Sequence, residues 1–282
     1  MLIGALLLGA PFAGGREAGG VSWLEGRPSH ESRFSVLLPE IVGFPAPVRA
    51  AFAAGIALGT GNWAWTERVR NADGETLARW DPSQPPGRRI VLLEVDGQRP
   101  TAGEVEAFLK RARSELAEGV KERPVLSRRM QRVVRAMRFS ELRREAGRID
   151  YRLEFAEPDL RGLGWVDRAF VRVLTGVEGS VVVDTQLPGF VAVDLSLAGP
   201  VRLLPGVKIE RLDVRIDSVP VPEARTWLPR NLLVEIRGGA WLFGRIARSL
   251  EMAFSDFTNV GLAPLPLEEV LAGAGAGGQG GE

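Results

Sequence analysis

Residues 62–113 read NWAWTERVRNADGETLARWDPSQPPGRRIVLLEVDGQRPTAGEVEAFLKRAR, and this stretch sets the pattern for the rest of the chain. Trp63 and Trp65 alternate with polar residues, which predicts a half-buried strand. Residues 75–80 and 90–95 predict two further strands, because turn residues separate each of them from its neighbours. The third strand is apolar on both faces, which favours a central position in a sheet.

The end of the same stretch predicts a helix. Thr101 and Glu104 have the spacing of a capping box, in which each side chain bonds the backbone N–H of the other residue. Val105 and Leu109 follow at helical spacing. We therefore expect an amphipathic helix over residues 102–118 that packs back on the sheet.

The pieces WAWTERVR, ARWDP and VLLEVDGQRPT, followed by this helix, resemble a group of uncharacterised bacterial envelope proteins. Those proteins are in turn similar to the superfamily of periplasmic lipoprotein carriers and outer-membrane lipoprotein receptors. The resemblance covers residues 62–260 and implies an incomplete β-barrel. The expected fold class is mainly β (α+β): a single curved antiparallel sheet or incomplete β-barrel, with helices packed as a lid.

The chain has 282 residues, and four segments are expected along it. Residues 1–15 hold a short apolar run followed by small residues, which predicts a signal peptide and a soluble, exported, periplasmic protein. Residues 16–61 are an N-terminal arm with a lid helix. Residues 62–262 are the half-barrel domain, and residues 263–282 are a flexible glycine-rich tail.

The second half of the chain reads mainly as strands. A change of apolar parity within residues 207–219 predicts a β-bulge near Glu210. Gly238 and Gly239 predict a turn after a strand over 232–237. The apolar spacing of residues 241–257 fits a helix, but the resemblance implies two strands there, and the prediction follows the resemblance.

Catalytic and metal chemistry has few candidates in this sequence. The absence of Cys excludes disulfides, thiolate nucleophiles and Cys-ligated zinc, and His30 is the single histidine. Asp73, Asp81 and Asp96 each adjoin Gly or Pro and are expected in turns. No catalytic residue, metal site or cofactor is predicted, and the chain is not expected to be an enzyme.

Charge gives no general attraction to nucleic acid, because 36 basic and 35 acidic residues leave a net charge of +1. A local basic surface is expected on a second amphipathic helix, whose apolar stripe runs over residues 126–137. Such a surface suits transient contact with a membrane or an acidic partner, and a solvated helix face is the alternative. Its candidate residues are Arg128, Arg129, Arg132, Arg135 and Arg138.

The apolar faces of the strands supply a second set of candidates. Strand parity selects these residues for the inner face of the sheet, and core filling is the alternative for each of them. The candidate lining positions of a ligand cavity are Trp63, Trp65, Ile90, Leu92, Val193, Leu195, Val214 and Ile216.

Two functions are compatible with these features. The first is an exported, non-enzymatic carrier or chaperone that binds an apolar ligand, a lipid or the acyl chains of an acylated protein, in a half-barrel cavity. The alternative is an envelope interaction or assembly protein with a filled barrel core, which works through its Arg-rich helix. No nucleic-acid partner is expected, and the oligomeric state stays open.

Overall fold

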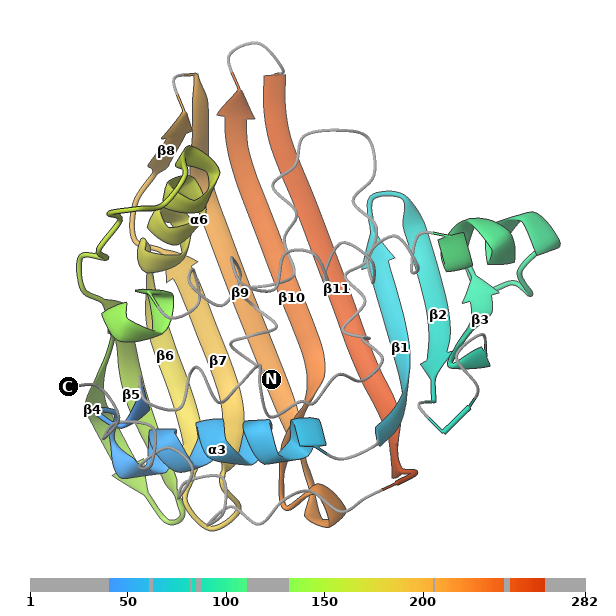
Figure 1. Cartoon of the computed structure of the whole chain (residues 1–282), viewed down its shortest axis with the longest axis horizontal. Coiled ribbons are helices and arrows are strands. Elements are labelled where there is room, and N and C mark those ends of the chain that lie inside the picture. The colour runs from blue at the N-terminus through green and yellow to red at the C-terminus, as the bar shows by residue number, and fades with distance from the viewer. Residues whose placement is uncertain are drawn as a thin grey trace.

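One antiparallel sheet organises the protein (Figure 1). The structure is a computed structural model that describes residues 41–60, 63–81, 83–84, 88–110, 132–204, 206–240 and 244–261. Within these ranges eleven strands form the sheet, in the order β3-β2-β1-β11-β10-β9-β7-β6-β5-β4, and β8 pairs with β9 beside that row. The strands are β1 (Trp63–Asn71), β2 (Gly74–Trp80), β3 (Ile90–Val95), β4 (Met137–Glu145), β5 (Arg148–Phe155), β6 (Val177–Asp184), β7 (Gly189–Leu197), β8 (Val201–Leu204), β9 (Val207–Val221), β10 (Thr226–Ala240) and β11 (Gly244–Asn259).

The sheet is open, and its two ends are β3 and β4. No hydrogen-bonded pair of described strands joins these ends, so the sheet does not close into a barrel. Helix α3 (Ala46–Thr60) crosses one face and contacts β6, β7 and β10 (Figure 1). Helix α6 (Trp165–Thr175) contacts β6 and β8. The predicted fold class, a mainly β chain with a single incomplete sheet and accompanying helices, is confirmed.

The first three strands form in the predicted order. The turn between β1 and β2 is closed by the Asp73 N–H, which donates to Asn71 Oδ1 at 2.8 Å. The predicted central position of β3 is wrong, because β3 is one end of the sheet. Val91 and Leu93 are 47% and 39% exposed, so the second apolar face of β3 meets solvent instead of a further layer.

The predicted capping box begins the helix over residues 102–110. The Thr101 N–H donates to Glu104 Oε2 at 2.7 Å, and the Glu104 N–H donates to Thr101 Oγ1 at 3.3 Å. Hydrogen bonds from the backbone and hydroxyl of Thr101 lower the pKa of the Glu104 carboxyl. The expected continuation of this helix to residue 118 lies outside the described residues.

Replacing Thr101 by Ala is expected to lower the free energy of unfolding by about 1 kcal/mol, because the Glu104 N–H loses its side-chain acceptor. Denaturant unfolding followed by circular dichroism measures the change. Thr101→Ser keeps the hydroxyl and is the matched control, expected to unfold as wild type does. If Thr101→Ala also matched wild type, this cap would contribute nothing to stability.

The inner face of the sheet forms the main core. Residues directly opposite each other on neighbouring strands share a face, and apolar pairs of this kind run from β5 to β11. Helix α3 covers part of this face, where the Phe52 ring meets Phe190 of β7 with centroids 5.1 Å apart. The Phe44 ring, just before α3, meets Phe139 of β4 at 5.0 Å. The helix predicted within residues 16–61 is therefore present and packs on the sheet.

The long pair of β9 and β10 explains one predicted feature and corrects another. The register between the two strands skips Glu210, which confirms the predicted bulge. Gly238 and Gly239 lie inside β10 and do not form the predicted turn. A Cβ on Gly238 would come within 2.3 Å of the Lys208 carbonyl oxygen, so glycine is needed there for close approach of β9.

Within the segment predicted over 241–257, the described residues 244–257 form neither a helix nor two strands. A single strand, β11, runs through it and pairs with β10 on one side and β1 on the other. Leu250 and Met252 lie opposite Val234 and Leu232, so strand pairing determines the conformation of a segment whose apolar spacing also fits a helix. The predicted extended conformation is confirmed, and the predicted number of strands is wrong.

The second amphipathic helix ends earlier than its apolar stripe predicts. Residues 132–136 are helical, and β4 follows directly at Met137. β4 then pairs antiparallel with β5. Arg138 therefore lies on a strand and not on the helix.

Several expectations fall on residues that the structure does not describe. The signal peptide, most of the N-terminal arm and the glycine-rich tail belong to residues 1–40 and 262–282, outside the described ranges. They remain predictions.

Candidate functional site

Four of the eight predicted lining residues lie together in the core. Val193 and Leu195 of β7 are directly opposite Ile216 and Val214 of β9. Between 2% and 5% of each residue is exposed, and all four belong to one buried cluster. The structure therefore brings these four residues together, and they lie within the packed core of the sheet.

The other four candidates lie in a different part of the sheet. Trp63 is 6% exposed and forms a second buried cluster with Leu228, against which Trp65 packs. Ile90 and Leu92 lie on β3, at the end of the sheet. The eight residues therefore do not line one cavity.

The tryptophans of β1 contain two polar atoms without partners. Trp63 Nε1 and Trp65 Nε1 are buried and have no hydrogen-bond acceptor in the described part of the chain. A buried donor without an acceptor costs about 1–3 kcal/mol.

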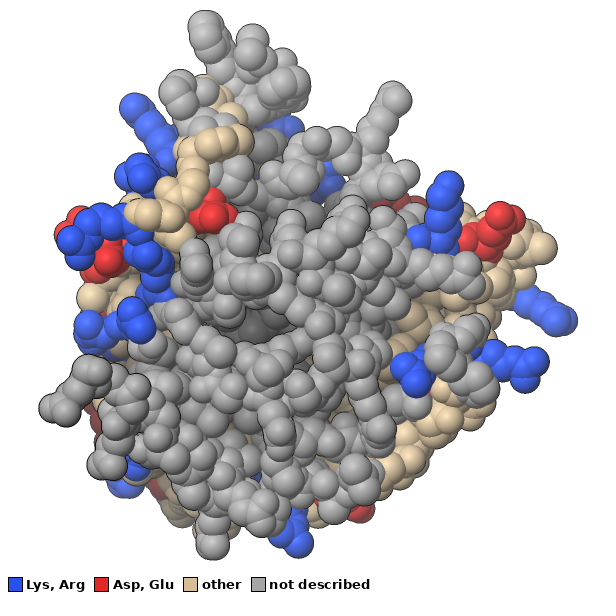
Figure 2. All heavy atoms as spheres, viewed as in Figure 1, with Lys and Arg blue, Asp and Glu red and all other residues tan. Residues whose placement is uncertain are grey.

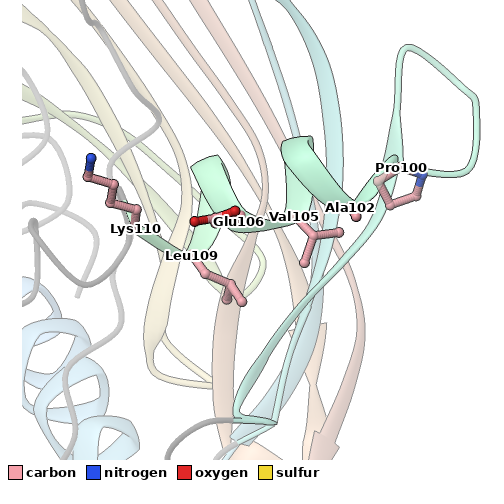
Figure 3. Close-up of a pocket in the computed structure, with 6 residues that line it drawn as sticks. All are labelled: Pro100, Ala102, Val105, Glu106, Leu109 and Lys110. Carbon is pink, nitrogen blue, oxygen red and sulfur yellow. The ribbon is translucent and has the colours of Figure 1, made fainter.

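An open pocket of about 600 Å³ lies along the helix over residues 102–110 (Figure 3). This helix starts the connection from β3 to β4, the two ends of the open sheet. Val105 and Leu109 point to the same side of it and are only half-buried. The described lining residues are Pro100, Ala102, Val105, Glu106, Leu109 and Lys110.

Val105 and Leu109 were not among the predicted lining residues. Their spacing predicts an apolar face buried against the sheet, which is the usual role of such a face. The edge position of β3 changes this expectation, because the helix follows an end strand directly and keeps part of its apolar face accessible. Knowledge of the strand order was needed to find this pocket.

The predicted basic surface is only partly described. Arg128 and Arg129 lie outside the described residues. Arg138, on β4, donates to the backbone carbonyls of Arg135 and Met137 at 2.7 and 2.8 Å. This guanidinium therefore serves the local backbone at the junction of helix and strand.

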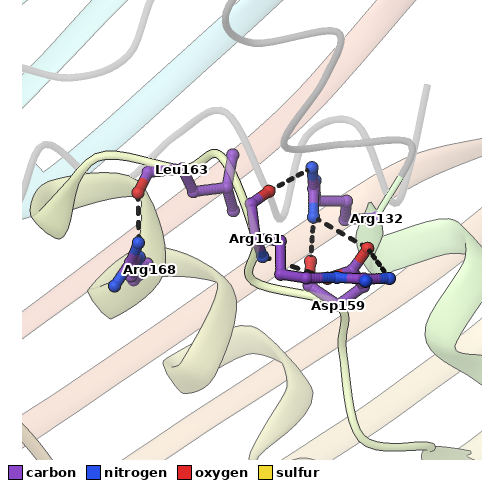
Figure 4. Close-up of polar contacts among 5 residues, drawn as sticks. All are labelled: Arg132, Asp159, Arg161, Leu163 and Arg168. Atoms are coloured by element: carbon purple, nitrogen blue, oxygen red, sulfur yellow. Dashed lines mark hydrogen bonds and ion pairs between the residues drawn. The ribbon is translucent and has the colours of Figure 1, made fainter.

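Arg132 joins its helix to the loop before α6 (Figure 4). Its guanidinium donates to the backbone carbonyls of Asp159 and Arg161, the latter at 2.7 Å, and lies 3.6 Å from the Asp159 carboxylate. Hydrogen bonds from Arg161, and then the charges of Arg161 and Arg132, lower the pKa of Asp159. The role of Arg132 in this structure is to hold a loop.

The described residues offer little for metal or acid–base chemistry. Within them, no group of three or more His, Cys, Asp or Glu side chains is placed to hold a metal ion, and His30 lies outside them. The pKa of Glu75 is lowered, first by the hydrogen bond from Arg70 and then by that from Arg68, which keeps this carboxylate charged. No helix of the described ranges has the length and apolar character needed to cross a bilayer.

No protein-family model matches this chain, and no curated protein or solved structure matches it either. The resemblance of residues 62–260 to periplasmic lipoprotein carriers therefore stays a prediction. The open sheet and the pocket along residues 102–110 provide the structural support for a function.

Proposed function

We propose that this chain is a non-enzymatic carrier or chaperone of the bacterial envelope, which binds a lipid or the acyl chains of an acylated protein. The main support is the open pocket along residues 102–110, next to the end strand of a sheet that does not close. An amphipathic helix with an accessible apolar face over such a pocket suits a ligand without charge along most of its length.

The size of the pocket agrees with this proposal. Ligand sites commonly have volumes of about 300–1,000 Å³, and the volume of this open pocket, about 600 Å³, lies in that range. Complete burial of a ligand's alkyl chain of ~14 methylenes contributes roughly 11 kcal/mol to the free energy of binding. The costs of association and of ordering the ligand are subtracted from this figure. Micromolar affinity is therefore attainable through apolar contacts.

Leu109→Glu is expected to weaken binding of palmitic acid at least about 100-fold, because a carboxylate on the pocket wall retains water and is costly to desolvate. Isothermal titration calorimetry measures the affinity. Ala107→Glu places the same charge on an exposed position of the same helix and is the matched control, expected to bind as wild type does.

The outcome also separates the two functions considered for this chain. Saturable binding that Leu109→Glu removes and Ala107→Glu retains supports the carrier. If folded wild type binds neither palmitic acid, nor phosphatidylglycerol, nor a diacylated lipopeptide, the carrier proposal is wrong. The interaction or assembly protein with a filled core then becomes the better description.

A further inference from the structure

Trp165, the first residue of α6, is the most exposed of the large apolar side chains in the described ranges. Its exposed fraction is 65%, although tryptophan is usually well buried in a folded domain. The two arginines that follow at helical spacing, Arg168 and Arg172, are also exposed. Residues at positions i, i+3 and i+7 of a helix share one face. These three side chains form a stripe on the outside of α6.

The opposite side of α6 holds the helix on the protein. Val171, Val173 and Leu174 are buried in the main core, with exposed fractions of 0%, 1% and 7%. The helix therefore does not need the Trp165 ring to dock on the sheet. A large apolar side chain outside the core contact is available for a partner.

The loop that presents Trp165 is fixed by arginines (Figure 4). Arg132 donates to the carbonyls of Asp159 and Arg161, and Arg168 Nε donates to the Leu163 carbonyl at 2.8 Å. Three loop carbonyls that precede the helix are thus satisfied by charged donors. Ordering this loop in advance lowers the entropy cost of binding through Trp165.

The surroundings of Trp165 are basic. The Arg161 side chain is 92% exposed, and its guanidinium lies 3.0 Å from the Asp159 carboxylate. The same carboxylate also faces Arg132 at 3.6 Å, so one acid is shared by two arginines. Figure 2 shows several Lys and Arg side chains, with Asp and Glu side chains among them, on the side of the molecule where Figure 1 places α6 and β8.

We infer that this stripe, Trp165, Arg168 and Arg172, together with Arg161 of the preceding loop, docks the protein on a membrane surface that carries anionic lipid headgroups. An indole ring prefers the boundary between headgroups and acyl chains. Guanidinium groups beside it pair with lipid phosphates, and their long side chains allow the ring to insert while the charges stay in water. The combination of one exposed indole with three exposed arginine side chains suits an anionic lipid surface in polarity and in charge.

Vesicle flotation with the full-length chain tests this inference. Wild type is expected to bind vesicles of phosphatidylcholine with one quarter phosphatidylglycerol, and binding is expected to fall as salt increases. Trp165→Ser is expected to weaken this binding at least about tenfold, while Trp165→Phe retains most of it. Each Arg→Gln change at positions 161, 168 and 172 is expected to weaken it about fivefold.

A second exposed pair, again one large apolar side chain next to one arginine, provides the control. Leu142 is 60% exposed and the Arg143 side chain 67% exposed, both on β4. The double variant Leu142→Ser, Arg143→Gln is expected to bind vesicles as wild type does.

Three results would overturn the inference. They are absence of vesicle binding by wild type at low salt, equal binding by Trp165→Ser and wild type, and an equal loss in the β4 control. If the affinity of the protein for polyglutamate exceeds its affinity for the vesicles, the stripe binds an acidic protein partner instead of a membrane. These measurements do not depend on the apolar ligand of the pocket, so either proposal can fail alone.

Discussion

Replacing Gly179 by Ala is expected to lower the free energy of unfolding by about 3 kcal/mol or more. Gly179 lies in β6, opposite Leu195 of β7. A Cβ at this position would stand 1.9 Å from the Asp194 carbonyl oxygen, and that oxygen belongs to the backbone. A rotating side chain cannot relieve such an overlap, so β6 and β7 would have to separate. Urea unfolding of the purified variant measures the loss.

Gly199→Ala is the matched control for this change. No atom lies within 4 Å of a Cβ built on Gly199, which follows β7. Its stability is expected to stay within about 0.5 kcal/mol of wild type. If both variants were equally stable, the close approach of β6 to the backbone of β7 would be wrong.

Val214→Asp is expected to prevent folding or to cost more than about 4 kcal/mol. Val214 is 3% exposed and has Leu195 of β7 on one side and Val234 of β10 on the other. A carboxylate there would be buried within the apolar core cluster. Val214→Ala removes two methyl groups and is expected to cost roughly 2 kcal/mol while the fold is retained. Far-UV circular dichroism and urea unfolding report both changes.

The comparison of Val214→Asp with Leu109→Glu distinguishes core from pocket. Both variants add a carboxylate at an apolar position, Val214 in the buried core and Leu109 on the wall of the open pocket. We expect the first to unfold the chain and the second to leave a folded protein without ligand binding. A folded Val214→Asp variant that only lost binding would show instead that the inner face at β9 is an open ligand surface.

Much of the sheet was predictable because its signals are local. The alternation of apolar residues, the turn chemistry at Asp73 and the capping box at Thr101 each act within a few residues. The bulge at Glu210 was predictable for the same reason, since a change of apolar parity within one strand requires an extra residue. The length of β11 was not predictable from local signals, because pairing with both β10 and β1 extends this strand.

The position of the candidate site depends on strand order, which local patterns do not determine. Ile90 and Leu92 are predicted cavity residues although parity does not choose between the two apolar faces of β3, and the strand lies at the end of the sheet. Val193 and Ile216 were assigned to the same cavity by parity alone, and parity does not separate a filled face from an open one. The half-buried face of Val105 and Leu109 could be interpreted only once the neighbouring end strand was known.

The pairing of β1 with β11 has a consequence for how the protein is made. Val69 lies opposite Met252, so the unit formed by β1, β2 and β3 attaches to the rest of the sheet through the last described strand. A ribosome releases β1 long before β11, and the unpaired edge of β1 stays exposed while most of the chain is translated. Contacts between residues so distant in sequence also slow folding. Yield during synthesis should therefore depend on a chaperone that shields β1 more than on the final stability of the sheet.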